Sequence, residues 1–236
     1  MRFLLTCAFL LLTSVASHSY SQVDRLEAGL AAYDRGQYAT AIRAWMRAAE
    51  EGSPEAQNNV GHMYEEGLGV PQNYLLAMNW YRQAAEGGLP EGQHNMGLLY
   101  YHGYGVAENL IESVRWFRMA AEQEFPESEY MLGMAYEQGK GVALDYALAR
   151  EYLLRSARRN YPSAQLMYAF MLQAGEGGVS DSYNGYLWGK IALENGVEDA
   201  VNITSIASIP LSQQQIDQAD ALAKLCLEEG FDVCME

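Results

Sequence analysis

The sequence predicts an all-α fold, an α-solenoid of antiparallel helix pairs closed by a C-terminal capping helix. The first observation behind this prediction is a seven-residue motif: YEEGLGV at 64–70, YYHGYGV at 100–106 and YEQGKGV at 136–142, each 36 residues after the last. The second is helical spacing of the apolar residues between these motifs. Periods of roughly 20–50 residues are typical of repeat proteins in which stacked helices share one continuous core.

The first half of each repeat is predicted to be a helix that ends at a glycine. In residues 56–66, Val60, Met63 and Tyr64 share one stripe, and Gly61 beside them lets a neighbouring helix approach closely. Gly67 is expected to stop the helix, because glycine adopts the left-handed conformation at low cost.

The second half is predicted to be a helix that packs back on the first. Its apolar face combines large aromatic residues with alanines, namely Ala77, Trp80, Tyr81, Ala84 and Ala85. Four repeats follow from the period, at residues 54–89, 90–125, 126–161 and 162–197. In the fourth, Gly178 replaces valine and Gly185 lies where a helix residue is expected, which predicts an irregular loop.

The two ends differ from the repeats. Residues 24–53 form a shorter unit with only Gly36 and Gln37 at its turn. Residues 198–236 are expected to hold one amphipathic capping helix and a disulfide tail. That helix begins at Ser212 as N-cap, and its apolar stripe is Ile216, Ala219, Leu222, Ala223 and Leu225.

The repeated motif resembles the Sel1-like repeat, a relative of the tetratricopeptide repeat, over residues 24–197. The matching positions include Gly61, Tyr64, the pair Gly67 and Gly69, and Trp80. The resemblance implies a right-handed superhelix, with residues 24–53 as a tetratricopeptide-like N-terminal repeat. It also implies a C-terminal helix that caps the solenoid, as in many secreted bacterial relatives.

Residues 1–16 read as a secretory signal peptide. Arg2 is followed by an apolar run from Phe3 to Leu12, and cleavage is expected after Ala16. The alternative is an N-terminal anchor, but the run is shorter than the roughly 20 residues that a spanning helix needs. The sequence therefore predicts a periplasmic or secreted protein that does not insert into the membrane after cleavage.

After cleavage two cysteines remain, Cys226 and Cys234. In an exported protein such a pair favours a disulfide, and Gly230 between them lets the tail fold back; two inert thiols are the alternative. No zinc-ligand spacing and no nucleophile motif is present, so we expect no metal, no cofactor and no catalytic residue. Acidic residues on the helices are expected to form a solvated face.

The composition gives a net charge of −15, from 15 basic and 30 acidic residues. An acidic surface repels phosphate backbones, so nucleic acid is not an expected partner. Solubility is the simpler explanation of the charge, and the alternative is a surface that binds cations or a basic partner.

The positions that vary between repeats are the candidates for binding. By resemblance to the tetratricopeptide fold, the first helix of each repeat lines the concave surface, which predicts a protein or peptide groove. Packing between repeats is the alternative role of these residues. The candidates are Asn58, His62, Glu65, His94, Leu98, Tyr101, His102, Tyr130, Met134 and Glu137.

The predicted function is a non-catalytic scaffold or adaptor for a protein or peptide partner. The alternative is a small-ligand-binding or hydrolytic protein, since some Sel1-like relatives are associated with penicillin binding or β-lactam hydrolysis. Those relatives carry a cysteine pair in each repeat, and the repeats here carry none. The sequence does not determine the partner or the oligomeric state.

Overall fold

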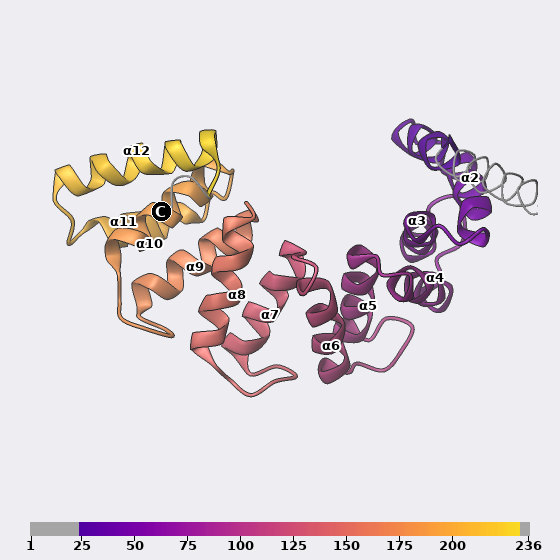
Figure 1. Ribbon diagram of the computed structural model, residues 1–236, viewed down its shortest axis with the longest axis horizontal. Helices are drawn as coiled ribbons and strands as arrows, with labels where there is room; N and C mark the ends of the chain where they lie inside the picture. The colour runs from indigo at the N-terminus through magenta and orange to yellow at the C-terminus, as the bar shows by residue number, and fades with distance from the viewer. Residues whose placement is uncertain (1–23, 232–236) are drawn as a thin grey trace, which may run out of the picture. The chain divides into compact units, whose positions relative to one another are not determined.

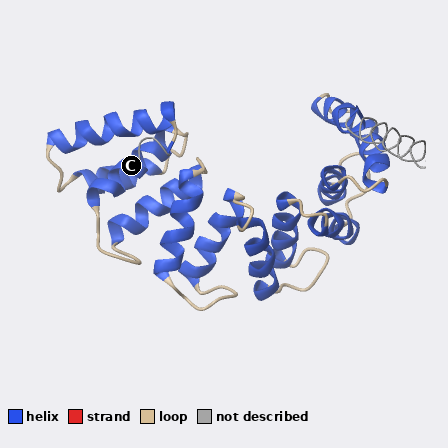
Figure 2. Ribbon diagram, in the orientation of Figure 1, coloured by secondary structure: helices blue, strands red, loops and turns tan. Residues whose placement is uncertain are grey.

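The computed structural model describes residues 24–231, and within that range the secondary structure consists of helices without a strand (Figure 2). The described chain divides into two compact units, with the boundary between Glu108 and Asn109. The predicted signal peptide and Cys234 lie outside the described residues.

The first unit begins with a helix over residues 24–34. It continues with α2 (Tyr38–Glu50), α3 (Pro54–Glu66), α4 (Tyr74–Glu86) and α5 (Pro90–His102) (Figure 1). The second unit contains α6 (Leu110–Ala121), α7 (Pro126–Gln138), α8 (Tyr146–Arg158), α9 (Pro162–Ala174), α10 (Ser182–Glu194), α11 (Ala200–Ser208) and α12 (Gln213–Glu229). Successive helices form antiparallel pairs, which confirms the predicted all-α repeat fold.

The helix ends repeat with the same 36-residue step. Proline opens the first helix of every repeat, at 54, 90, 126 and 162. An Asn or Asp side chain caps every second helix by accepting backbone N–H bonds; these caps are Asn73, Asn109, Asp145 and Asp181. Gly67 ends α3 with φ of 69°, in the left-handed conformation that the sequence predicts.

In the first and third of the four 36-residue repeats, an aromatic or aliphatic side chain covers the repeat glycine in the core. The Tyr81 ring lies directly over Gly61, where a Cβ atom would come within 2.6 Å of the ring. Gly133 is covered by Leu153 in the same way. The predicted close approach at the repeat glycine is therefore present in both units.

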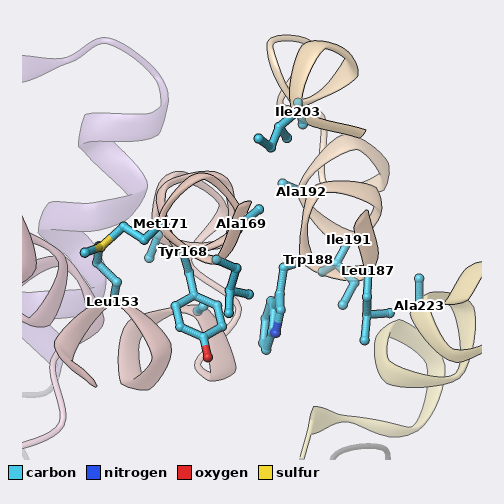
Figure 3. Packing of buried hydrophobic residues seen from close by; sticks show 14 of the residues in the cluster. Leu153, Tyr168, Ala169, Met171, Leu187, Trp188, Ile191, Ala192, Ile203 and Ala223 are labelled. Atoms are coloured by element: carbon cyan, nitrogen blue, oxygen red, sulfur yellow. The ribbon is translucent and has the colours of Figure 1, made fainter. Parts of the chain in front are cut away.

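In the second unit the core continues into the C-terminal helices. Tyr168 meets Trp188 edge-on with ring centroids 5.5 Å apart (Figure 3). Trp188 also stacks on Phe231, with ring centroids 5.4 Å apart. Ile203 from α11 and Ala223 from α12 complete this cluster.

The second glycine of each G-x-G loop contacts the repeat before it, which the sequence did not indicate. Gly105 lies against the backbone of Tyr74, the first residue of α4, and a Cβ atom there would come within 2.9 Å of it. Gly177 lies on the carbonyl of Tyr146 at the start of α8, where a side chain would overlap that carbonyl. The equivalent pairs are Gly69 with Tyr38 and Gly141 with Leu110. Each loop therefore closes on the second helix of the preceding repeat.

The loop of the fourth repeat keeps the glycine geometry of the other loops and differs from them in one turn hydrogen bond, so the expected irregularity is small. Gly175 and Gly177 have φ of 75° and 73°, close to the 69° and 71° of Gly67 and Gly69. The Arg150 side chain fills the space beside Gly178, where other repeats have valine. The two glycines keep their left-handed conformation, and the Gly178 N–H donates to the Gly175 carbonyl at 3.4 Å, a bond that the loops with valine do not make.

The C-terminal segment contains two helices where the sequence predicts one. Ser212 is the N-cap of helix α12, as predicted; it also forms a capping box with Gln215, and the helix packs on α10. Its buried residues are Ala219, Ala223 and Cys226. The assignment of Leu225 to the apolar stripe is wrong, because Leu225 is 41% exposed. The helical period places Cys226, not Leu225, toward the core.

Candidate functional site

The candidate site is a set of equivalent positions on the first helix of each repeat. Their side chains differ between repeats and are not fully buried in the core. The ten predicted residues belong to this set or adjoin it, and all of them are at least partly exposed. We use the name first-helix face for these positions in each unit. In the first unit they are Asn58, His62 and Glu65 on α3 and His94, Leu98, Tyr101 and His102 on α5; in the second unit they are Tyr130, Met134 and Glu137 on α7.

On α3 the three predicted residues are held by neighbouring helices. Asn95 Nδ2 on α5 donates to Asn58 Oδ1 at 2.9 Å. The His62 Nε2 atom lies 3.3 Å from the hydroxyl of Tyr33. These polar residues therefore connect adjacent helices and also keep a partly exposed surface.

Glu65 has a defined partner in its own repeat. The Tyr81 hydroxyl donates to Glu65 Oε2 at 2.6 Å. Burial, followed by the adjacent Glu65 carboxylate, raises the pKa of Tyr81 and keeps the phenol protonated. Because the phenol fixes one carboxylate oxygen, Glu65 presents its charge in a constant position.

His94 on α5 differs from an exposed histidine. Burial among the helices lowers the pKa of His94 to about 4, so its imidazole is neutral at physiological pH. A neutral imidazole can accept as well as donate a hydrogen bond, unlike a cationic one. The first-helix face is therefore not positively charged at this position.

His102 is part of an exposed aromatic stack that the sequence did not reveal. Its ring stacks on Tyr104 at 5.2 Å, and Tyr104 stacks on Tyr74 at 4.8 Å. Tyr101 meets the His102 ring edge-on at 5.0 Å. Tyr104 remains 42% exposed. The loop motif itself places Tyr104 beside the glycines, which is the signal that could have identified it.

On α7 the three predicted residues have different surroundings. Tyr130 packs on Tyr161 with ring centroids 5.3 Å apart and also contacts the core of the second unit. Met134 and Glu137 are partly exposed on the same helix. Tyr130 thus combines packing between repeats with an accessible surface.

The series of partly exposed first-helix positions extends beyond the predicted residues. Further steps of 36 residues lead to Leu166 and Phe170 on α9 and to Asn202 and Ile206 on α11. These four side chains border a groove of about 230 Å³, together with Met167, Asp199 and Ile203. The repeat period alone could have identified them.

Potential metal ligands come together at one place in the part of the chain that the structure describes. The ligand atoms of His62, Glu65 and Glu66 lie within 4.8 Å of one another. His62 and Glu65 already interact with Tyr33 and Tyr81. We therefore assign no metal to this group.

Within residues 24–231, no helix combines the length and the apolar composition that crossing a bilayer requires.

The paired helices, the glycine loops and the surface on the first helices define a helical repeat protein. The chain belongs to the Sel1 repeat family: four Sel1 repeats match at residues 54–89, 90–125, 126–161 and 162–197. A search of curated proteins gives no match.

Solved structures share this fold. A Sel1 repeat protein from Oxalobacter formigenes is 27% identical with a TM-score of 0.72, and the match covers 84% of each chain. A protective antigen present in uropathogenic Escherichia coli strains is 30% identical with a TM-score of 0.76. That match covers 94% of this chain and 49% of the antigen, so this chain spans about half of the antigen's length. Pseudomonas aeruginosa pilF matches in fold at 19% identity, with a TM-score of 0.51 over 87% of this chain and 99% of that one.

Proposed function

We propose that this protein is a non-catalytic scaffold that binds a protein or peptide partner on the first-helix face. Sel1 repeat proteins are generally protein-interaction scaffolds and typically non-catalytic, which supports the proposal. The observation that carries it is the pattern of variation. Core positions such as Gly61 and Gly133 keep their identity, whereas partly exposed positions change from Asn58 to His94 to Tyr130.

The chemistry of these positions suits protein recognition. Tyr101 and Tyr130 offer aromatic area with few rotatable bonds, and such residues are enriched among binding hot spots. Asn58 and Glu65 add polar groups whose positions are fixed by Asn95 and Tyr81. Fixed polar groups reduce the ordering cost of binding.

The proposed location is the periplasm or the extracellular space, following cleavage after Ala16. N-terminal sequencing of the exported protein checks this part, and a chain that still begins at Met1 would contradict it. We also propose the Cys226–Cys234 disulfide, which mass spectrometry of the unreduced protein tests. Cys226 is buried in α12, and its predicted partner lies beyond residue 231.

The binding proposal is tested by capture of partners from an envelope extract of the native host, followed by mass spectrometry and measured affinities. Replacing Tyr101 and Tyr130 together by alanine is expected to weaken binding by more than about 2 kcal/mol with helicity unchanged. Arg82→Ala, an exposed change on the second helix α4, is the matched control and is expected to have little effect. Loss of binding in the Arg82 variant alone would place the binding surface on the other helices.

A further inference from the structure

The groove between α9 and α11 is lined mainly by apolar side chains and is open to solvent. Phe170 on α9 is 51% exposed and Ile206 on α11 is 52% exposed. Leu166, Met167 and Ile203 line the groove between them. Its volume of about 230 Å³ accommodates one large aromatic or aliphatic side chain.

The walls of this groove are held in place by the core. On α11, Ala200, Ile203 and Ala207 are buried, and on α9 so are Tyr168 and Met171. Ile203 belongs to the same core cluster as Trp188. Because both helices are anchored on their inner sides, an occupant would meet a preformed site and incur little ordering cost.

Exposed apolar side chains extend beyond the groove along α11. Val201 is 51% exposed and Ile209, directly after the helix, is 80% exposed. Ile209 is also one 36-residue step after Gln173 on α9. A short helix that exposes this much apolar area offers a surface that a partner can bury favourably.

A single charged residue, Asp199, lines the groove. It is the N-cap of α11, but its side chain makes no capping hydrogen bond. In the described part of the chain no Lys or Arg pairs with it. The carboxylate is therefore available to a cation, within a protein whose net charge is −15.

We infer that this groove binds a short segment of another protein that presents a large apolar side chain next to a lysine or arginine. The apolar side chain enters between Phe170 and Ile206, and the basic group faces Asp199. This inference rests on the proposed scaffold function and names the chemistry of its partner. A second copy of this acidic chain would bring like charge to the groove.

The test uses the purified exported chain and a displayed library of short random linear peptides. We expect the recovered peptides to share an aromatic residue, leucine or methionine adjacent to lysine or arginine. Phe170→Ser is expected to weaken their binding at least about tenfold, as loss of a central apolar contact does. Asp199→Asn keeps the shape of the groove and is expected to weaken binding about threefold or more, with a smaller effect at high salt.

Ile111→Ser is the matched control, because Ile111 is 74% exposed on α6 in the same unit and does not line the groove. It is expected to leave peptide binding unchanged. Circular dichroism and thermal unfolding establish that each variant is folded. Recovered peptides that are acidic or lack an apolar anchor would overturn the inference, as would binding that is indifferent to both Phe170→Ser and Asp199→Asn.

The outcomes separate this inference from the proposed function. Peptides that depend on Tyr101 and Tyr130 but not on Phe170 would refute the α9–α11 groove and leave the scaffold function standing. If neither the library nor the envelope extract yields a specific binder, both fail. Self-association that Phe170→Ser abolishes, measured by sedimentation, would identify a second copy as the occupant and overturn the inference.

Discussion

Arg155 forms an ion pair with Glu129, a fully buried carboxylate in a protein whose acidic residues were expected on solvated faces. Arg155 Nη2 lies 2.8 Å from Glu129 Oε1, and its Nε donates to the same oxygen at 2.9 Å. Arg159 Nη1 donates to Oε2 at 3.3 Å. Burial raises the pKa of Glu129, while Arg159 and Arg155 oppose that rise.

Arg155 supplies the hydrogen bond to a backbone carbonyl that a glutamine supplies in the other repeats. Gln57, Gln93 and Gln165 donate to the carbonyls of Ala49, Ala85 and Ala157 at 3.2–3.3 Å. Glu129 is in the same position of the third repeat, but a carboxylate has no hydrogen to donate. Arg155 Nη2 instead donates to the carbonyl of Ala121 at 3.2 Å.

We predict that Arg155→Met destabilises the protein by about 3 kcal/mol, because it removes a partner of a buried charge and the side-chain hydrogen bond to the Ala121 carbonyl, which keeps only the backbone N–H of Glu124. Arg159 keeps the loss from being larger. Urea unfolding monitored by circular dichroism measures the change. Arg158→Met, an exposed change on the same helix, serves as control and should alter stability by less than about 0.5 kcal/mol.

The same network predicts rescue by a second substitution. Adding Glu129→Gln to Arg155→Met restores the residue of the other repeats, and its amide can donate to the Ala121 carbonyl. The double variant is expected to recover at least about half of the lost stability. No recovery would mean that the cost lies in lost packing of the Arg155 side chain.

Two glycines should respond oppositely to alanine. At Gly61 the new methyl group would lie 2.6 Å from the ring of Tyr81, which Glu65 holds in place, so we expect a loss of about 1–3 kcal/mol. At Gly185 on α10 the nearest atom is 3.4 Å away, which is ordinary contact. Gly185→Ala should therefore stabilise by up to about 1 kcal/mol through helix propensity. Thermal unfolding of both variants checks this, and equal shifts would contradict the packing.

The loop contact between repeats can be separated from backbone strain. Gly177 and Gly196 have φ of 73° and 87°, so alanine is strained at either. Only at Gly177 would the methyl group also overlap a neighbour, the Tyr146 carbonyl; at Gly196 no atom lies within 4 Å. We expect Gly196→Ala to cost about 1 kcal/mol and Gly177→Ala to cost about 1–3 kcal/mol more. Similar costs in urea unfolding would show that the loop does not rest on α8.

His94 makes stability depend on pH. Its folded pKa of about 4 lies below the ordinary 6.5, so the unfolded chain binds the proton more readily. The stability that comes from burying the neutral His94 imidazole is fully present above about pH 6.5, and it is lost as the pH falls toward about 4. His94→Gln removes it, so the wild type should lose more stability than the variant between about pH 7 and pH 5. Parallel pH profiles in urea unfolding would contradict the burial of a neutral imidazole.

The sequence predicted those parts of the fold that repeat. A glycine every 36 residues identified the close helix contacts at Gly61 and Gly133, and the motif identified the left-handed Gly67. Helix α11 was not predicted, because it contains four β-branched residues of low helix propensity: Val201, Ile203, Thr204 and Ile206. Tertiary packing of Ile203 against the core outweighs that preference.

The candidate site was predictable only where its residues follow the period. His62 and Tyr130 were identified in this way, and Phe170 could have been. The partners that orient these residues could not be predicted from the period. The Tyr33–His62 contact, for example, joins a short, atypical repeat to a regular one. The Glu129–Arg155 pair likewise depends on a side-chain direction that no spacing reveals.

The contact between each loop and the preceding helix also bears on how the chain folds. Gly177 and Tyr146 are 31 residues apart in sequence, as are the other three pairs. The entropic cost of closing a loop depends on its length. Because the four contacts close loops of equal length, each repeat incurs the same modest cost. Folding can thus start at any helix pair within a unit and spread to its neighbours, without first bringing distant ends of the chain together.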